Sequence, residues 1–202
     1  MKNEEIILRE LASLCLSKKR VFTQLELSRR LGISLSIINS AIKNLEGISA
    51  VEIKQRGFVV ISLERLLLYW ATHRQLRKDR VYSTRVGAPV REIEASMPGG
   101  VAFTAYSGYR KLFQDAVADY SEVYLYATSE ALEEIRKRFP ERKGQPNLIV
   151  MKADRILEKM IKENKLEDSS APAPQLYADL WNISTWNAKE YLDALGKRLI
   201  GD

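Results

Sequence analysis

Residues 34–44 place six polar side chains where they would share the exposed face of a helix. These residues are Ser34, Ser36, Asn39, Ser40, Lys43 and Asn44. An asparagine amide can make two hydrogen bonds to adenine, a serine hydroxyl can donate or accept, and a lysine can reach guanine or a phosphate. Arginine, the commonest reader of guanine, does not occur in this stretch. These residue types favour contact with base edges in a DNA major groove.

Four cations flank this polar stretch in the sequence. Arg29 and Arg30 precede it, and Lys54 and Arg56 follow it in a segment with turn residues. Cations at such positions typically contact DNA phosphates or an adjacent minor groove. For each of these side chains taken alone, ordinary surface exposure is the alternative.

The surrounding sequence predicts the elements that would hold these residues. Thr23, with Glu26 three residues on, can cap a short helix that Gly32 ends, and Ser34 can cap a second helix that ends at Gly47. The buried face of the second helix is predicted to contain Leu35, Ile38, Ala41 or Ile42, and Leu45. Alternating residues at 51–54 and a second apolar run at 58–61 predict a hairpin. With an amphipathic helix over 4–16, in which Cys15 is a core residue, this order predicts a winged helix-turn-helix.

Residues 23–61 also resemble a known family. The pattern T-Q-x-E-L-S-R-R-L-G-I-S-x-S-x-I-N-x-A-I-K-x-L-E is similar to bacterial and archaeal winged-helix transcriptional regulators. The resemblance implies binding to double-stranded DNA, with the second helix of the motif in the major groove. Paired half-sites in DNA favour a homodimer.

The charge distribution agrees with this hypothesis. The chain has 202 residues and a net charge of +6; residues 1–96 hold 17 basic and 10 acidic side chains, and residues 97–202 hold 15 and 16. The whole basic excess therefore lies in the first half, as expected when one part of a protein binds nucleic acid.

The composition argues against catalysis. One histidine, His73, and one cysteine, Cys15, are too few for a zinc site, and no G-x-S-x-G motif supports a serine nucleophile. Gly99-Gly100 has a weak similarity to the phosphate-binding turn of nucleotidyltransferases, but no D-x-D motif follows to hold magnesium. We therefore expect no enzyme activity, no catalytic residues, no metal and no cofactor.

Two features predict a cytoplasmic protein that does not enter a membrane. The longest uninterrupted apolar stretch, about 66–71, is far shorter than the roughly 18 to 20 residues that span a bilayer. The start of the chain, Met1-Lys2-Asn3-Glu4-Glu5, carries acids where an export signal would carry bases.

The remaining chain predicts an α+β fold. We expect a helix over 63–79, with His73 on its packed face and with Arg74, Arg77, Lys78 and Arg80 at its cationic end, near the helix dipole or DNA phosphates. Further helices are expected from Gly99-Gly100 to Phe113 and over 90–95, 129–139, 154–163 and 185–199; strands over 123–127 and 147–152; and a loop or mobile linker over 165–174. The predicted domains are a winged helix (1–62), a connecting helix and linker (63–96) and a mixed α/β domain with a small sheet (97–202).

A second resemblance covers nearly the full length. Residues 102–109, 123–126 and 175–180, together with the preceding winged helix, are similar to the AbiEi-like antitoxins of type IV toxin–antitoxin systems. The resemblance implies an autorepressor whose C-terminal domain counteracts a cognate toxin protein. Two alternatives stay open: an interaction module whose winged helix does not read DNA, and a ligand-sensing regulator.

Overall fold

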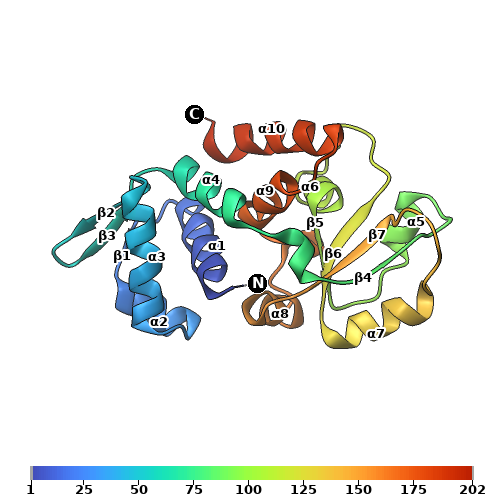
Figure 1. Ribbon diagram of the computed structural model, residues 1–202, viewed down its shortest axis with the longest axis horizontal. Helices are drawn as coiled ribbons and strands as arrows, with labels where there is room; N and C mark the ends of the chain where they lie inside the picture. The colour runs from blue at the N-terminus through green and yellow to red at the C-terminus, as the bar shows by residue number, and fades with distance from the viewer. Residues whose placement is uncertain (1, 202) are drawn as a thin grey trace.

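A computed structural model describes residues 2–201 as an elongated molecule of helices and two small sheets (Figure 1). The first part contains α1 (Asn3–Leu16), β1 (Val21–Phe22), α2 (Gln24–Leu31), α3 (Leu35–Gly47), β2 (Val51–Lys54), β3 (Gly57–Val60) and α4 (Leu63–His73). The middle contains the 3-10 turn η1 (Leu76–Asp79), β4 (Arg80–Thr84), α5 (Val90–Ala95), β5 (Val101–Thr104), α6 (Ala105–Phe113), β6 (Val123–Ala127) and α7 (Ser129–Arg138). The last part contains β7 (Leu148–Lys152), α8 (Arg155–Lys162), η2 (Glu167–Ser169), α9 (Ala173–Trp181) and α10 (Trp186–Ile200). The structure is therefore an α+β fold.

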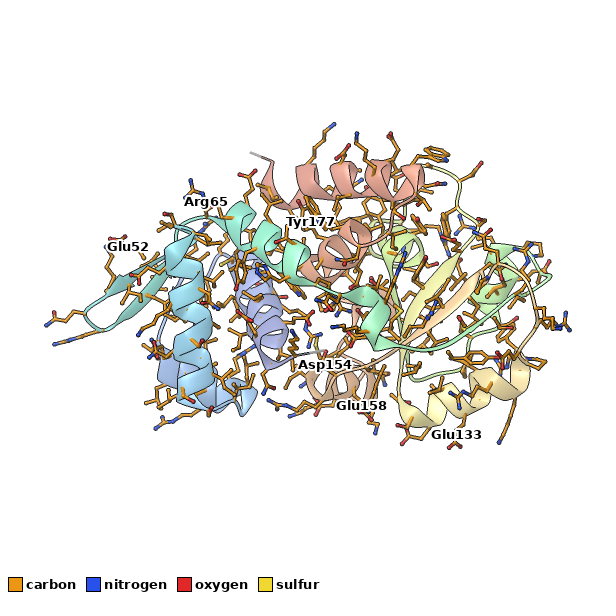
Figure 2. The ribbon with its side chains drawn as sticks, in the orientation of Figure 1. Glu52, Arg65, Glu133, Asp154, Glu158 and Tyr177 are labelled. Carbon is orange, nitrogen blue, oxygen red and sulfur yellow. The ribbon has the colours of Figure 1, made fainter. Side chains whose placement is uncertain are left out.

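Local signals in the sequence set the ends of the first helices. The Thr23 hydroxyl accepts a hydrogen bond from the Glu26 amide (3.1 Å), and Gly32 ends α2 in the left-handed conformation with φ of 60°. The Ser62 hydroxyl caps α4 by accepting from the Arg65 amide at 3.2 Å. Arg65, labelled in Figure 2, also donates to the Ile48 carbonyl at 3.2 Å and so ties α4 to the end of α3.

The first sheet has three antiparallel strands in the order β1-β3-β2. Phe22 of β1 and Phe58 of β3 stack with their ring centroids 5.6 Å apart, and both side chains are buried. This small sheet therefore packs its inner face on the helices through two aromatic rings.

The second sheet has four strands in the order β4-β7-β6-β5. The central strands β6 and β7 are parallel and are joined through α7, whereas β4 and β5 are antiparallel edges. One face of the sheet packs on Ile93 of α5 and Ile135 of α7. The other face, which includes Tyr126 and Met151, joins the large core formed with α6, α9 and α10.

Helix α4 packs against both α1 and α9 (Figure 1). Its residues Leu66, Leu67 and Trp70 are completely buried in the same apolar core that contains residues of α1 and α9. The apolar core therefore continues past residue 62, where we predicted a domain boundary; the boundaries themselves stay a prediction.

Arg74 is the centre of a buried ionic cluster where these parts meet. Its guanidinium donates to Glu5 of α1 (3.0 Å), Asp79 of η1 (2.5 Å) and Asp179 of α9 (3.0 Å). The fourth partner is the Tyr126 hydroxyl at 2.9 Å. Because a guanidinium has five N–H donors in a fixed plane, one side chain satisfies groups from four elements.

Asp179 is as fully enclosed as the arginine that binds it. Its second oxygen accepts from the hydroxyls of Thr104 (2.8 Å) and Tyr126 (2.7 Å). Burial raises the pKa of Tyr126 well above its usual value, and the negative charge of Asp179 raises it further. The phenol therefore stays protonated and acts as a donor to the carboxylate.

A second buried ion pair lies beside this cluster. Arg9 of α1 donates two hydrogen bonds to Asp154, at 2.7 and 2.8 Å, and a third to Gln175 of α9 at 3.2 Å. Asp154 also caps α8 by accepting from the amides of Ile156 and Leu157, and Figure 2 shows it between α8 and α1. Gln175 in turn donates to Asp179, so the two ion pairs form one network.

After residue 62 the structure confirms most predicted elements and corrects three. Residues 101–104 form a strand and not the start of a helix. All four side chains are buried, and the sequence of such a short buried strand has no periodicity that distinguishes it from a helix. The loop predicted over 165–174 ends earlier than expected: the Ala171 amide donates to the Phe103 carbonyl at 2.8 Å, along the edge of β5, and α9 begins at Ala173. Strand β4 was not predicted.

The third correction concerns the helix predicted over 63–79. Helix α4 ends at His73, because the backbone becomes extended at Arg74 and turns its side chain into the core. Arg74 is therefore inaccessible to a DNA phosphate. His73, expected on the packed face, is exposed.

Within residues 2–201, no helix combines the length and the apolar character that crossing a lipid bilayer requires.

Replacing Arg74 with methionine is expected to lower the free energy of unfolding by about 3–5 kcal/mol, because it leaves buried carboxylates without their counter-charge. Urea unfolding followed by circular dichroism measures this change. The control is Arg77→Ala, an exposed arginine three residues along, which should change stability by less than about 0.5 kcal/mol. Equal stabilities of the two variants would contradict the role given to Arg74.

The Arg9–Asp154 pair predicts a loss of stability in acid. Burial alone would raise the pKa of Asp154, but the hydrogen bonds and charge of Arg9 lower it below its ordinary value. A carboxylate with a lower pKa in the folded state stabilises the protein above its unfolded pKa of about 4, and this stability disappears as the pH falls further. Urea unfolding between pH 7 and pH 3 should therefore show a shallower decline below pH 4 for Asp154→Asn than for the wild type.

Candidate nucleic-acid interface

Helix α3 and its N-cap residue, Ser34, contain the six polar residues predicted from the sequence. Asn39 is half-buried, and the other five, Ser34, Ser36, Ser40, Lys43 and Asn44, are exposed. The opposite face buries Ile38, Ala41, Ile42 and Leu45, as predicted. Because the helix is anchored by this apolar face, its polar face is held rigidly toward solvent.

The predicted buried position of Leu35 is wrong. Its side chain is 47% exposed, and the neighbouring Ile37 is 37% exposed. Both lie in the first turn of α3. Among the apolar residues from 33 to 38, only Ile33 and Ile38 are buried in the core. An exposed apolar side chain among polar ones can contact the methyl group of thymine. Leu35 was expected to be buried because its spacing to Ile38, Ile42 and Leu45 is that of one helix face.

The cations of α2 and the hairpin are all exposed. Arg29 and Arg30 lie in the last turn of α2, and Lys54 and Arg56 lie at the β2–β3 turn. Figure 1 shows this hairpin projecting from the body beside α3, at the end of the molecule. The structure therefore gathers the predicted residues on adjacent elements, α2, α3 and the hairpin.

Five of the ten predicted residues already have partners within the protein. Arg30 pairs with Glu10, Lys54 pairs with Glu52, the amide of Asn44 donates to Glu4 at 3.0 Å, and the hydroxyls of Ser34 and Ser36 lie 3.2 Å apart. The Ser34 hydroxyl makes no capping bond to the backbone of α3, contrary to expectation. The other five, Arg29, Asn39, Ser40, Lys43 and Arg56, have no side-chain hydrogen bond or ion pair within residues 2–201.

The start of α2 is held by charge as well as by its cap. Lys19, in the turn before β1, pairs with Glu26. The hydrogen bond from Lys19 lowers the pKa of the Glu26 carboxyl. A hydrogen bond from the Thr23 backbone N–H also lowers the pKa of Glu26, as the expected reciprocal capping arrangement requires, so the carboxylate faces both Thr23 and Lys19.

Chemically, the exposed groups of this surface can donate and accept hydrogen bonds and attract anions. Among the residues that the structure describes, no cluster of three or more histidine, cysteine, aspartate or glutamate side chains is arranged to hold a metal ion. Cys15 is buried, and burial raises the pKa of its thiol to about 11. It is a core residue, as expected.

The hairpin depends on a close approach at Gly57. A Cβ atom at this position would lie 2.3 Å from the backbone carbonyl oxygen of Phe22. Gly57→Ala is therefore expected to lower the free energy of unfolding by more than about 1 kcal/mol, because two backbone segments must separate. At Gly47, the last residue of α3, a Cβ would meet no atom within 4 Å.

Gly47→Ala is the matched control, and it is expected to raise stability by up to about 1 kcal/mol. Urea unfolding of both variants measures the difference. An equally stable Gly57→Ala protein would show that β1 and β3 do not approach as closely in solution.

No protein-family model, no curated protein sequence and no solved structure matches this chain. The resemblances to winged-helix regulators and to AbiEi-like antitoxins therefore stay predictions.

Proposed function

We propose that this chain is a sequence-specific DNA-binding transcriptional regulator whose residues 1–62 form a winged helix-turn-helix. The observation that carries the proposal is the exposed polar face of α3 beside a hairpin tipped by Lys54 and Arg56. The order α1-β1-α2-α3-β2-β3, with the sheet order β1-β3-β2, supports it because this arrangement suits a helix-turn-helix followed by a wing.

In the proposed complex, α3 enters the major groove. Its residues Asn39, Ser40 and Lys43 have no side-chain partners within residues 2–201, so they are available to base edges. Arg29 and the cations at the hairpin tip contact phosphates and thereby fix the register of the helix. Base contacts then provide the sequence specificity.

The proposal extends to the biological role. The basic excess of residues 1–96 and the nearly neutral remainder support a division between DNA binding and a partner-binding or oligomerising role for the second half. We propose a cytoplasmic repressor that acts as a homodimer and, by the antitoxin resemblance, an autorepressor with a cognate toxin protein as its partner.

A second candidate is a protein-interaction module. The exposed Leu35 and Ile37 on α3, and Val21, which is 65% exposed on β1, favour it because apolar surface suits a protein partner. The two candidates differ in their response to salt, since phosphate contacts weaken steeply as salt rises.

The test is an electrophoretic shift with the DNA upstream of the chain's own coding sequence, repeated at several salt concentrations. For the wild type we expect specific binding that weakens with salt. For Lys54→Ala/Arg56→Ala, the slope of log affinity against log salt should become shallower by about 1.8, or about 0.9 for each phosphate that is no longer neutralised.

The control variant is Lys189→Ala/Lys197→Ala, which removes two exposed lysines from α10. It removes the same net charge and should leave the slope within about 0.5 of the wild type. If the wild type shows no specific shift at moderate salt, the DNA-binding proposal fails. If both double variants behave alike, the hairpin is not part of the interface.

A further inference from the structure

A cavity of about 420 Å³ lies on the face of the second sheet that also joins the large core. Three segments that are distant in sequence enclose it: η1 with the start of β4, the strands β6 and β7 with their preceding residues, and the turn between α9 and α10. This volume lies within the range of pockets that bind small molecules. The cavity is far in sequence from α3 and the hairpin.

The cavity has an apolar floor and a polar rim. Leu76, Ile149 and Met151 are buried at the floor, together with the half-buried ring of Tyr124. Polar groups surround this floor, namely Arg77, Arg80, Glu122, Gln145, Asn182 and Ser184. An apolar base with a few convergent polar groups is the usual composition of a ligand site, because the base binds the body of the ligand and the rim orients it.

Charges of both signs face this cavity without neutralising one another. Arg77 and Arg80 form no ion pair and no side-chain hydrogen bond within residues 2–201, and both are exposed. Glu122 is half-buried, and its carboxylate accepts a long hydrogen bond from the Tyr124 hydroxyl, at 3.4 Å. Burial raises the pKa of Glu122, and the hydrogen bond from Tyr124 opposes only part of this rise.

The walls of the cavity are held in place by bonds to other elements. The side-chain amide of Asn182 donates to the carbonyls of Ala71 (3.1 Å) and Ala178 (2.9 Å), and Thr185 bonds to the Tyr106 hydroxyl at 2.7 Å. Asp79 fixes η1 through Arg74. A site with fixed walls binds without a large ordering cost, which favours affinity.

We propose that this cavity is a binding site for a small organic anion with a flat apolar body and an N–H or O–H donor. The anionic group, a carboxylate, sulfonate or phosphate, pairs with Arg77 and Arg80. The apolar body lies over Tyr124, Ile149 and Met151, and the donor bonds to Glu122. An arginine pair suits such an anion because guanidinium groups make charge-assisted and bidentate hydrogen bonds.

The probe for the test is 8-anilinonaphthalene-1-sulfonate, which carries a sulfonate, an aromatic body and an N–H donor. Fluorescence titration of the full-length protein should give saturable binding to one site. Arg77→Ala/Arg80→Ala should raise the dissociation constant at least about tenfold, since it removes both charge-assisted donors. The matched control is Arg85→Ala/Arg142→Ala, two exposed arginines that line a separate hollow, and it should stay within about twofold of the wild type.

Two further measurements check the location of the probe and the integrity of the variants. In nuclear magnetic resonance spectra, the side-chain amides of Gln145 and Asn182 should shift on titration, whereas the amide of Asn39 on α3 should not. Thermal unfolding should show that both double variants fold like the wild type.

The proposal is overturned by any of three results. They are no saturable binding by the wild type, an equal fall in affinity in the two double variants, and shifts that centre on residues outside the cavity. Because no DNA is present, these results do not depend on the proposed regulatory function, and failure of one proposal leaves the other intact.

Discussion

The guanidinium of Arg74 is the group on which the arrangement of this protein depends. It lies at the end of α4, holds Glu5 of α1 and Asp179 of α9, and reaches the second sheet through the Tyr126 hydroxyl. Removing buried arginines and their carboxylates from water is costly, and their mutual attraction offsets this cost only if the donors and acceptors are satisfied. Here Thr104, Gln175 and Tyr126 supply further hydrogen bonds to the cluster. Because these hydrogen bonds are directional, the network fixes how α1, α4, α9 and the second sheet are placed relative to one another.

This placement has consequences for the proposed function. The exposed face of α3 is anchored through α1 and α4 to the same network that holds α9 and the second sheet. The proposed DNA surface and the second half of the chain are therefore packed as one body around these contacts, without a polar linker between them. The proposed ligand cavity has its walls on η1 and on the turn after α9, which adjoin Asp79 and Asp179, so both proposed surfaces are built on one rigid core.

Much of the first half could be predicted from the sequence, because its signals are local. Thr23, Gly32 and Ser62 act at the helix ends as their residue types predict, and the apolar spacing of α3 identifies Ile38, Ile42 and Leu45 as its buried face. All ten predicted interface residues are at least partly accessible for the same reason. The exposure of Leu35 was not predictable, since it depends on where the preceding turn directs the first residue of the helix. The strands β4 and β5 escaped prediction because neither alternates clearly between apolar and polar residues.

The sequence by itself determined the type and order of most elements and the location of the basic excess, because capping, periodicity and charge are properties of neighbouring residues. Only the tertiary structure decided the roles of Arg9 and Arg74, which the sequence presents as ordinary cations of surface helices. Their carboxylate partners lie up to 145 positions away, in elements that meet only after folding. The proposed role of Arg77 and Arg80 in ligand binding also depends on the tertiary structure, since the cavity beside them is formed by three segments that are distant in sequence.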